Sequence, residues 1–296
     1  MLTVHLKFYV ILKLIEIYRG PMAFSTSFKK VRKQKKVSTE TSFKNGFKFE
    51  NWLFLIPLGM VFTVWEIALK LNLISSKTLP APSKILTVLF FDLLKDPVFI
   101  VGVFHSLITL MLGVVLAAIV AIPFAILTGL ESKLDSSLTP LIMIVGALPD
   151  VALLPLFVYW FGPGTTAAII MATVVAFFPI FFTVREGVKD IPKDYFHVAL
   201  IYKARKIDVY TKLVLPAVLP QLVTGIRLAY EFLWEIVLAI EIIARVSGVG
   251  FIINFAVESG SLTYAFAGIF MIGIIAIIID RLVFQRVEDR IRRWHE

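Results

Sequence analysis

Long uninterrupted runs of apolar residues, separated by short charged stretches, make up most of this chain. No Asp, Glu, Lys or Arg occurs between Asp96 and Glu131, and none occurs between Asp150 and Arg185. An α-helix rises about 1.5 Å per residue, so roughly 20 apolar residues cover the ~30 Å hydrocarbon core of a membrane. The pattern therefore predicts membrane-spanning helices in series and not the core of one water-soluble domain.

Six such segments follow residue 50, and together they predict an all-α integral membrane protein. The third contains Pro149 and Pro155, which a membrane helix tolerates because neighbouring helices and water satisfy the freed backbone groups. We therefore expect one six-helix domain over residues 51–296. The expected transmembrane helices are Trp52–Leu71, Ser106–Gly129, Ser137–Phe161, Thr165–Val184, Ala217–Ala244 and Thr263–Phe284.

Residues 1–50 form a basic leader of mixed polarity. Its first part, Met1–Gly20, has an apolar middle that is too short to span a membrane, and no small-residue cleavage site follows it. Two interpretations stay open: an interfacial helix, or translation that begins at Met22, just after a Gly-Pro break. Phe28–Lys48 is rich in Lys, Ser and Thr, which is typical of a solvated cytoplasmic tail.

Lys and Arg are distributed unevenly among the segments that connect the expected spans. The leader, the connection between the fourth and fifth spans, and the C-terminal tail are rich in both residues. The connections after the third and fifth spans carry none beyond Arg245. Cytoplasmic loops of membrane proteins show such an excess. We therefore expect a multi-pass protein of the cytoplasmic (inner) membrane, with both termini and the long basic loop in the cytoplasm.

The composition supports a membrane protein and excludes several kinds of chemistry. Hydrophobic residues are 58% of the 296 residues and charged residues 17%, against roughly 45–50% and about 25% in soluble domains. The net charge of +9 fits the predicted orientation without nucleic acid as a partner. The absence of cysteine excludes a disulfide, a thiolate metal site and a Cys nucleophile.

The histidines are too scattered along the chain to converge on one site at membrane depth. We therefore expect no metal site and no catalytic residues, which argues against a membrane-embedded enzyme. They lie in the leader, at the end of a span, in the basic loop and at the C-terminus: His5, His105, His197 and His295.

The most informative segment is the basic loop over residues 185–215. Apolar residues such as Val198, Ile207 and Leu213 are interspersed with charged residues, as on short amphipathic helices. Many transporters have basic cytoplasmic loops, so this pattern alone is not specific. The loop closes on Leu215-Pro216, which marks its end.

This loop resembles the EAA loop of permeases in the nitrate/sulfonate/taurine group of binding-protein-dependent ABC importers. The family pattern is Glu-Ala-Ala, three residues, Gly, and about a dozen residues to Leu-Pro. Here it falls on His197-Val198-Ala199, then Lys203, then Leu215-Pro216. Further matches follow in family order from about Trp52 to the C-terminus: Leu79-Pro80-Ala81-Pro82-Ser83, His105-Ser106-Leu107, Leu148-Pro149, Trp160-Phe161-Gly162, Phe178-Pro179-Ile180, Thr224–Ala229, Trp234, Glu241 and Ser247–Ile252.

The resemblance implies a type I ABC permease fold and a division of labour among subunits. The EAA loop would form a coupling helix in a groove of a separate ATPase subunit. The permease would work as a dimer and receive its solute from an extracytoplasmic binding protein. This chain lacks a Gly-x4-Gly-Lys-Ser/Thr phosphate loop, so ATP would be bound by the partner and no cofactor by this chain. The implied coupling residues are His197, Ala199, Lys203, Ala204, Leu215 and Pro216.

Two positions depart from the family pattern, since His197 replaces the Glu and Lys203 replaces the Gly. Glycine permits a tight turn with positive φ, which lysine adopts only at a cost. Either the coupling helix turns differently in this protein, or Lys203 meets an acidic residue of a matching ATPase.

Ionisable residues within the expected spans are candidates for the translocation pathway, because charge is expensive in hydrocarbon. Asp150 lies in the third span, and Arg227, Glu231 and Glu235 follow at four-residue steps in the fifth. An Arg227–Glu231 pair that merely orders the helices is the alternative. An acidic interior fits a neutral, cationic or heteroaromatic solute better than a simple anion. By family analogy, vitamin or pyrimidine precursors are candidates.

A rival interpretation is an ion-coupled secondary transporter in which Asp150 and Glu235 bind protons. Such carriers are commonly built from two sequence-similar halves, which are not evident in this chain. Transport that persists in ATP-depleted vesicles would favour this alternative.

Overall fold

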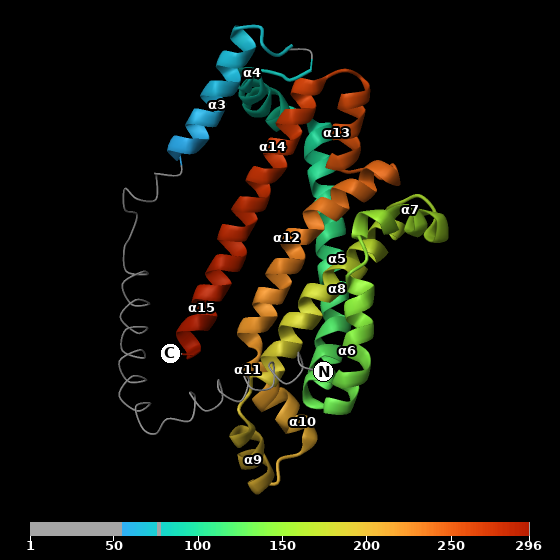
Figure 1. Cartoon of the computed structure of the whole chain (residues 1–296), viewed down its shortest axis with the longest axis vertical. Helices are drawn as coiled ribbons and strands as arrows, with labels where there is room; N and C mark the ends of the chain where they lie inside the picture. Colours follow the sequence, from blue (N-terminus) through green and yellow to red (C-terminus); the bar gives the residue numbers. More distant parts are fainter. Residues whose placement is uncertain (1–54, 76–77, 296) are drawn as a thin grey trace, which may run out of the picture. The chain divides into compact units, whose positions relative to one another are not determined.

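The computed structural model describes residues 55–75 and 78–295, and every regular element within these ranges is a helix (Figure 1). The chain divides into two compact units, residues 1–64 and 65–296. The described part of the first unit, residues 55–64, forms the N-terminal part of α3 (Leu55–Lys70). The leader, with both interpretations of its first residues, lies outside the described ranges.

The second unit contains the remaining helices. The longer ones are α5 (Pro97–Leu130), α6 (Ser132–Gly146), α7 (Asp150–Phe161), α8 (Thr165–Lys189), α12 (Leu219–Ile243), α13 (Val249–Glu258), α14 (Leu262–Ile279) and α15 (Gln285–His295). The shorter ones are α4 (Pro82–Thr87), η2 (Val88–Asp92), η3 (Leu93–Lys95), α9 (Lys193–Ile201), α10 (Lys206–Asp208), η4 (Val209–Val214), α11 (Leu215–Ala217) and η5 (Asp280–Phe284).

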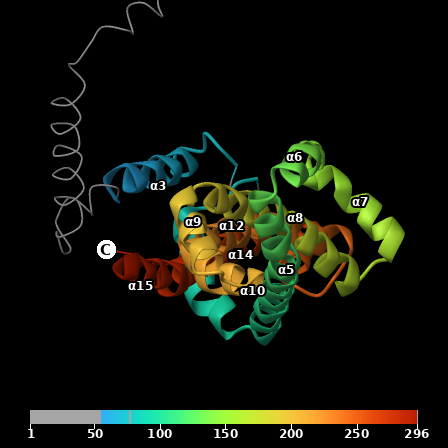
Figure 2. The ribbon, with the colours of Figure 1, turned by 90° about the horizontal axis from the view of Figure 1, so that it is seen from below.

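Helices α5, α8 and α12 pack side by side and form the core of this unit (Figures 1 and 2). Small residues allow this close approach, which matters because lipid tails give no hydrophobic drive for helices to associate. A Cβ on Gly113 of α5 would lie 2.6 Å from the Cβ of Ala172 in α8. A Cβ on Gly225 of α12 would overlap the Thr183 hydroxyl.

Helix α5 begins earlier than the sequence predicts, at Pro97 rather than at Ser106. The side chain of Asp96 caps the helix by accepting a hydrogen bond from the Val98 amide at 2.9 Å. Proline at the first position has no N–H to leave unsatisfied and has a φ suited to a helix start. These residues extend α5 to 34 residues.

The expected third span, Ser137–Phe161, is two helices, α6 and α7, bent by 90° relative to each other. The break falls between Gly146 and Asp150, where Pro149 adopts an extended conformation and has no amide hydrogen to continue the helix. Pro155, by contrast, stays inside α7. Pro140 likewise stays inside α6, so of the three prolines in this span only Pro149 coincides with the break.

Three helical segments in the described part of the chain are long and apolar enough to cross a membrane, or four if the bent pair counts as one span. They include α5, α8 and residues Leu262–Ile291, in which α14 continues through a π-helical turn, η5, into α15. The expected spans one and six correspond to α3 and α14, and the fifth to α12, which carries Arg227, Glu231, Glu235 and Glu241.

Helices also form outside the segments for which the sequence predicts them. One is α13, in the segment after α12 that contains the family match Ser247–Ile252. Figure 1 places α13 near one end of the second unit and α9 and α10 at the other end. The segments after α8 and after α12 thus lie at opposite ends of the core, as the charge distribution predicts for loops on opposite sides of a membrane.

Candidate coupling loop and charge clusters

The segment between α8 and α12 forms two short helical pieces beyond the end of the core (Figure 1). α8 ends at Lys189, and Pro192 is the N-cap residue of α9. After a turn at residues 202–205, α10, η4 and α11 lead back to α12. The sequence prediction of short helices in this loop is therefore matched by the structure.

The turn after α9 has the hydrogen bonds of a Schellman motif, with Lys203 in the left-handed conformation. Lys203 has φ of 49°. The Ala204 amide donates to the Ala199 carbonyl and the Lys203 amide to the Leu200 carbonyl, both at 2.9 Å. Lys203 thus adopts the positive φ for which glycine is suited, and the turn is not rearranged to avoid it. A non-glycine residue in this left-handed conformation costs about 1–2 kcal/mol of folding free energy.

The surface of α9 and of the following turn is apolar and exposed. No residue of α9 is buried. Leu200, Ile201 and Tyr202 have 73%, 77% and 81% of their surface exposed, respectively. His197 also lies on this surface, with its Nδ1 4.0 Å from Asp194. A contiguous exposed apolar patch on a short helix indicates a surface that binds a partner.

Opposite charges order the second half of the loop. The carboxylate of Asp208 accepts from Arg205 Nε at 2.7 Å and pairs with Lys212 Nζ at 2.8 Å. These hydrogen bonds, that from Arg205 first, lower the pKa of Asp208 to about 2. Where the loop ends at Leu215-Pro216, the adjacent Val214 and Val218 are buried and fix the loop against the core.

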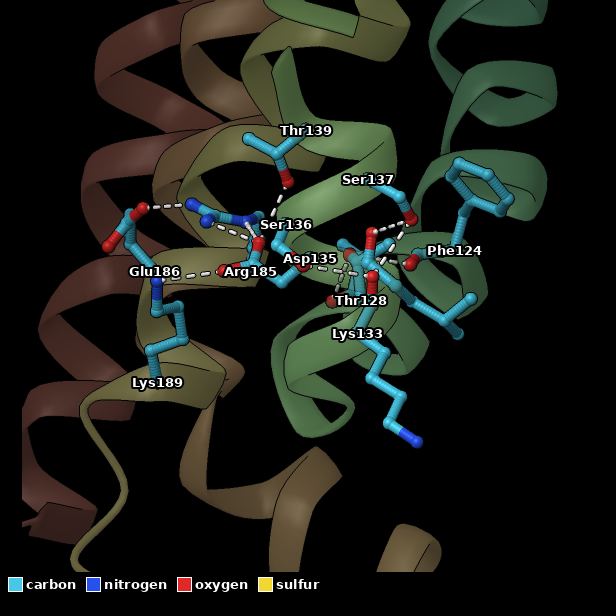
Figure 3. Close-up of polar contacts among 12 residues, drawn as sticks. Phe124, Thr128, Lys133, Asp135, Ser136, Ser137, Thr139, Arg185, Glu186 and Lys189 are labelled. Carbon is cyan, nitrogen blue, oxygen red and sulfur yellow. Dashed lines mark hydrogen bonds and ion pairs between the residues drawn. The ribbon is translucent and has the colours of Figure 1, made fainter. Parts of the chain in front are cut away.

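A buried arginine joins α6 to α8 beside this loop (Figure 3). The Arg185 guanidinium bonds the carboxylates of Asp135 and Glu186. Asp135 also accepts from Thr139 at 2.8 Å and from Lys189 at 3.1 Å. The sequence marked Arg185 only as one of the basic loop residues, because its acidic partner lies 50 positions away.

A second cluster surrounds Arg227 of α12. Its guanidinium pairs with Asp280 of η5 at 2.8 Å, with Glu288 of α15 at 3.0 Å and with Glu231 at 3.3 Å. An Arg227–Glu231 pair that orders the helices is the alternative to a pathway role that the sequence leaves open. This pair is present, as part of a larger network that links α12 to η5 and α15. Three carboxylates thus surround one arginine.

Glu235 lies away from this cluster. α12 contacts α7, whose first residue is Asp150, so the two carboxylates lie on neighbouring helices. In residues 55–75 and 78–295, neither carboxylate has an ion pair with a basic side chain. The four expected pathway residues therefore fall into two groups, Arg227 with Glu231 and Asp150 with Glu235.

The most buried acidic side chain, Glu241 of α12, was noted in the sequence only as a family match. It is 1% exposed and accepts from Ser106 Oγ at 2.6 Å and from the Gly250 amide at 2.8 Å. Ser106 in turn accepts from the Val249 amide at 3.0 Å. The carboxylate and hydroxyl thus cap α13 and fix it to α5 and α12. The available signal in the sequence was that Ser106 and Glu241 are polar residues within apolar runs.

Glu66 of α3 pairs with Lys70 at 4.0 Å, and it also accepts from Ser83 Oγ at 3.0 Å. This carboxylate therefore has partners both within its own helix and in α4.

Among the described residues, no group of three or more His, Asp or Glu side chains is placed to hold a metal ion.

These features describe an all-helical membrane protein with a helical loop that projects from one end of a packed core. A family model described as binding-protein-dependent transport system inner membrane component matches residues 113–293. The chain is 31% identical over 242 residues to the taurine transport system permease protein TauC of Escherichia coli, which covers 80% of this chain and 88% of TauC.

Two further relatives match this chain, one at lower identity and one over a shorter stretch. The putative aliphatic sulfonates transport permease protein SsuC of Bacillus subtilis is 27% identical, over 85% of this chain and 91% of SsuC. The nitrate import permease protein NrtB of Leptolyngbya laminosa is 32% identical, over 58% of this chain and 61% of NrtB. A solved structure of the MetNI methionine ABC transporter, in an inward-facing conformation, superposes with a TM-score of 0.57 at 19% identity, over 66% of this chain and 96% of that chain.

The chain belongs to the family of binding-protein-dependent transport system inner membrane components, and within it to the nitrate/sulfonate/taurine group of ABC importer permeases. The structural similarity shows the fold of a type I ABC importer permease. The comparisons give no support to an ion-coupled secondary transporter.

Proposed function

We propose that this chain is the permease subunit of an ATP-driven importer and that α9 is its coupling helix. The observation that carries the proposal is the exposed apolar surface of α9 and its following turn, formed by Leu200, Ile201 and Tyr202. This surface lies at the end of α8, a helix that runs through the core. A movement of a partner bound to α9 would therefore reach the core directly. ATP would be bound and hydrolysed by that partner subunit.

The proposed topology has six spans, with both termini and the coupling loop in the cytoplasm. α3, α5, the bent α6–α7 pair, α8, α12 and α14 supply the spans. α12 carries four charged residues, but Arg227 is paired with carboxylates of η5 and α15 and Glu241 is buried, which lowers the cost of placing these two charges in a membrane. Reporter fusions after Glu296 and within the segment after α3 are expected to lie on opposite sides.

The permease is proposed to act as a dimer that receives its solute from an extracytoplasmic binding protein. The α6–α7 pair supports a dimer, because Leu141, Ile144, Tyr159 and Trp160 expose apolar surface on it. Membrane lipid would cover what the second copy leaves exposed. The end with α13 would face the binding protein.

The proposed solute is a small neutral or cationic organic molecule, with heteroaromatic vitamin or pyrimidine precursors as the chemical class. Asp150 and Glu235 carry this proposal, since two carboxylates without a basic partner would repel a simple anion in a poorly screened site. The names of the relatives include taurine, aliphatic sulfonates, nitrate and bicarbonate, so the family itself spans several solutes.

Retention of an ATPase by the tagged permease tests the coupling proposal without knowledge of the solute. Leu200→Asp and Tyr202→Asp are expected to abolish co-purification of the ATPase, because they place charge in the proposed contact. Phe255→Asp is the matched control, since Phe255 is an exposed apolar residue of α13 near the opposite end. Equal retention by all three variants would contradict the proposal.

A further inference from the structure

An apolar groove lies between the coupling loop and the C-terminal helix. Its volume is about 660 Å³. Three segments form its walls: residues 190–195 after α8, the stretch from η4 to the start of α12, and the end of α15. The apolar lining includes Ile191, Pro192, Leu213, Pro216 and Leu219.

The groove lies at the level where the apolar helices end. α8 is a candidate span that ends at Lys189, one residue before the groove begins, and α12 begins at Leu219 on its other wall. Tyr195, an exposed aromatic residue, also lines it. Aromatic side chains are enriched where a membrane meets water. A lipid at the leaflet boundary could therefore place acyl carbons on the apolar walls.

The groove also presents one negative and one positive side chain. Asp190 comes from the segment after α8 and Arg290 from α15. Neither is in an ion pair within the described ranges, whereas neighbouring charges are paired: Lys189 with Asp135, and Arg227 with Glu288. Two unpaired charges of opposite sign in one apolar groove are complementary to a zwitterion.

We propose that this groove binds phosphatidylethanolamine, with Arg290 on the phosphate and Asp190 on the primary ammonium of the headgroup. A guanidinium forms bidentate hydrogen bonds with phosphate oxygens, and an ammonium donates hydrogen bonds to a carboxylate. Phosphatidylcholine lacks the N–H donors that Asp190 would accept from. Phosphatidylglycerol lacks the cation altogether. The site thus distinguishes lipids by the group attached to the phosphate, and it goes beyond the proposed transport function.

Native mass spectrometry of the purified permease–ATPase complex in nanodiscs tests this site. Phosphatidylethanolamine is expected to be retained preferentially over phosphatidylglycerol and phosphatidylcholine in equimolar mixtures. Asp190→Asn and Arg290→Gln should each weaken this retention about tenfold, the value of one charge-assisted hydrogen bond. Glu131→Gln and Arg281→Gln are matched controls, because both residues are exposed and lie outside the groove lining and outside the proposed coupling loop.

Several outcomes would overturn the proposal. If Arg290→Gln weakened the retention of all three lipids equally and Asp190→Asn changed nothing, the groove would bind the phosphate that the three lipids share, without distinguishing the headgroup. If phosphatidylethanolamine bound the permease but was displaced when the ATPase was added, the ATPase would be the occupant. Loss of retention in the two controls would show that the effect is not specific to this groove. Thermal unfolding of each variant establishes that the comparison is between folded proteins.

Discussion

At the scale of single residues, Lys203 shows how a side chain can depart from a family pattern while the backbone retains a strained turn. Its φ of 49° lies in the left-handed region, and the two Schellman hydrogen bonds hold it there. The family glycine would occupy this conformation without cost. A lysine retained despite that cost suggests that its charge is used at the surface of a partner.

Lys203→Gly is expected to leave the thermal stability of the permease unchanged or slightly higher. Relief of about 1–2 kcal/mol of backbone strain is partly offset by the greater entropy of glycine in the unfolded chain, roughly 0.5–1 kcal/mol. Lys206→Gly, in the right-handed α10, should lower stability. If Lys203→Gly keeps stability but weakens co-purification of the ATPase, the charge contact is established. Equal destabilisation by both variants would contradict the left-handed turn.

Gly225→Ala is expected to destabilise the contact between α8 and α12 by roughly 1–3 kcal/mol, the usual range for overpacking. The added Cβ would overlap Thr183 Oγ1 and lie 3.1 Å from the Ile180 Cα, which is backbone and cannot rotate away. Gly273→Ala in α14 meets nothing within 4 Å and is the control. Thermal unfolding in detergent measures both, and equal midpoints would contradict the packing.

At the scale of elements, α12 combines structural and candidate transport residues on different sides of one helix. Arg227 links α12 to η5 and α15, Glu241 caps α13, and Glu235 lies on a helix that contacts α7, the helix of Asp150. Residues at four-residue steps turn by about 40° per step, so a run from Arg227 to Glu235 drifts around the helix.

Glu235→Gln is expected to impair uptake of the solute carried by the partner binding protein while assembly with the ATPase stays intact. Glu235 forms no ion pair within the described residues, so this substitution leaves no basic residue without its partner. Arg227→Gln is expected to act in the opposite way, since it leaves Asp280, Glu288 and Glu231 without their cation and should lower expression or assembly first. Normal transport of an anion by Glu235→Gln would contradict the proposed pathway.

Some elements could be predicted from the sequence and others could not, for physical reasons. Apolar runs and Lys/Arg asymmetry were sufficient to predict α5, α8 and α14, because the length and hydropathy of an apolar run are local properties of the sequence. The break at Pro149 could not be predicted because a proline does not by itself end a helix, since Pro155 lies inside α7. The helix α13 depends on contacts between distant residues. The Ser106 and Glu241 bonds that cap α13 join positions 135 residues apart. The distant partners of Arg185 and Arg227, namely Asp135, Asp280 and Glu288, were unpredictable for the same reason.

At the scale of the whole molecule, the chain is a permease in which charged side chains link helices of the core to one another and to the C-terminal helix. Asp135 and Arg185 join α6 to α8 (Figure 3). Arg227 joins α12 to α15. The expected coupling residues divide between α9 with its turn and the return of the loop to α12, where Leu215 and Pro216 lie. The expected pathway residues divide between α7 and α12. Family membership fixes this architecture but leaves the solute to be determined.

Disulfide crosslinking across the loop tests the central claim most directly, because the chain has no cysteine and needs no background substitutions. Single cysteines at positions 199–208 would be paired with cysteines in the groove of the ATPase, in a complex that still hydrolyses ATP. Crosslinks are expected at exposed positions around Ala204, and none is expected at Ser261, between α13 and α14. If no position from 199 to 208 crosslinks in an active complex, α9 is not the coupling helix and the proposed mechanism is wrong.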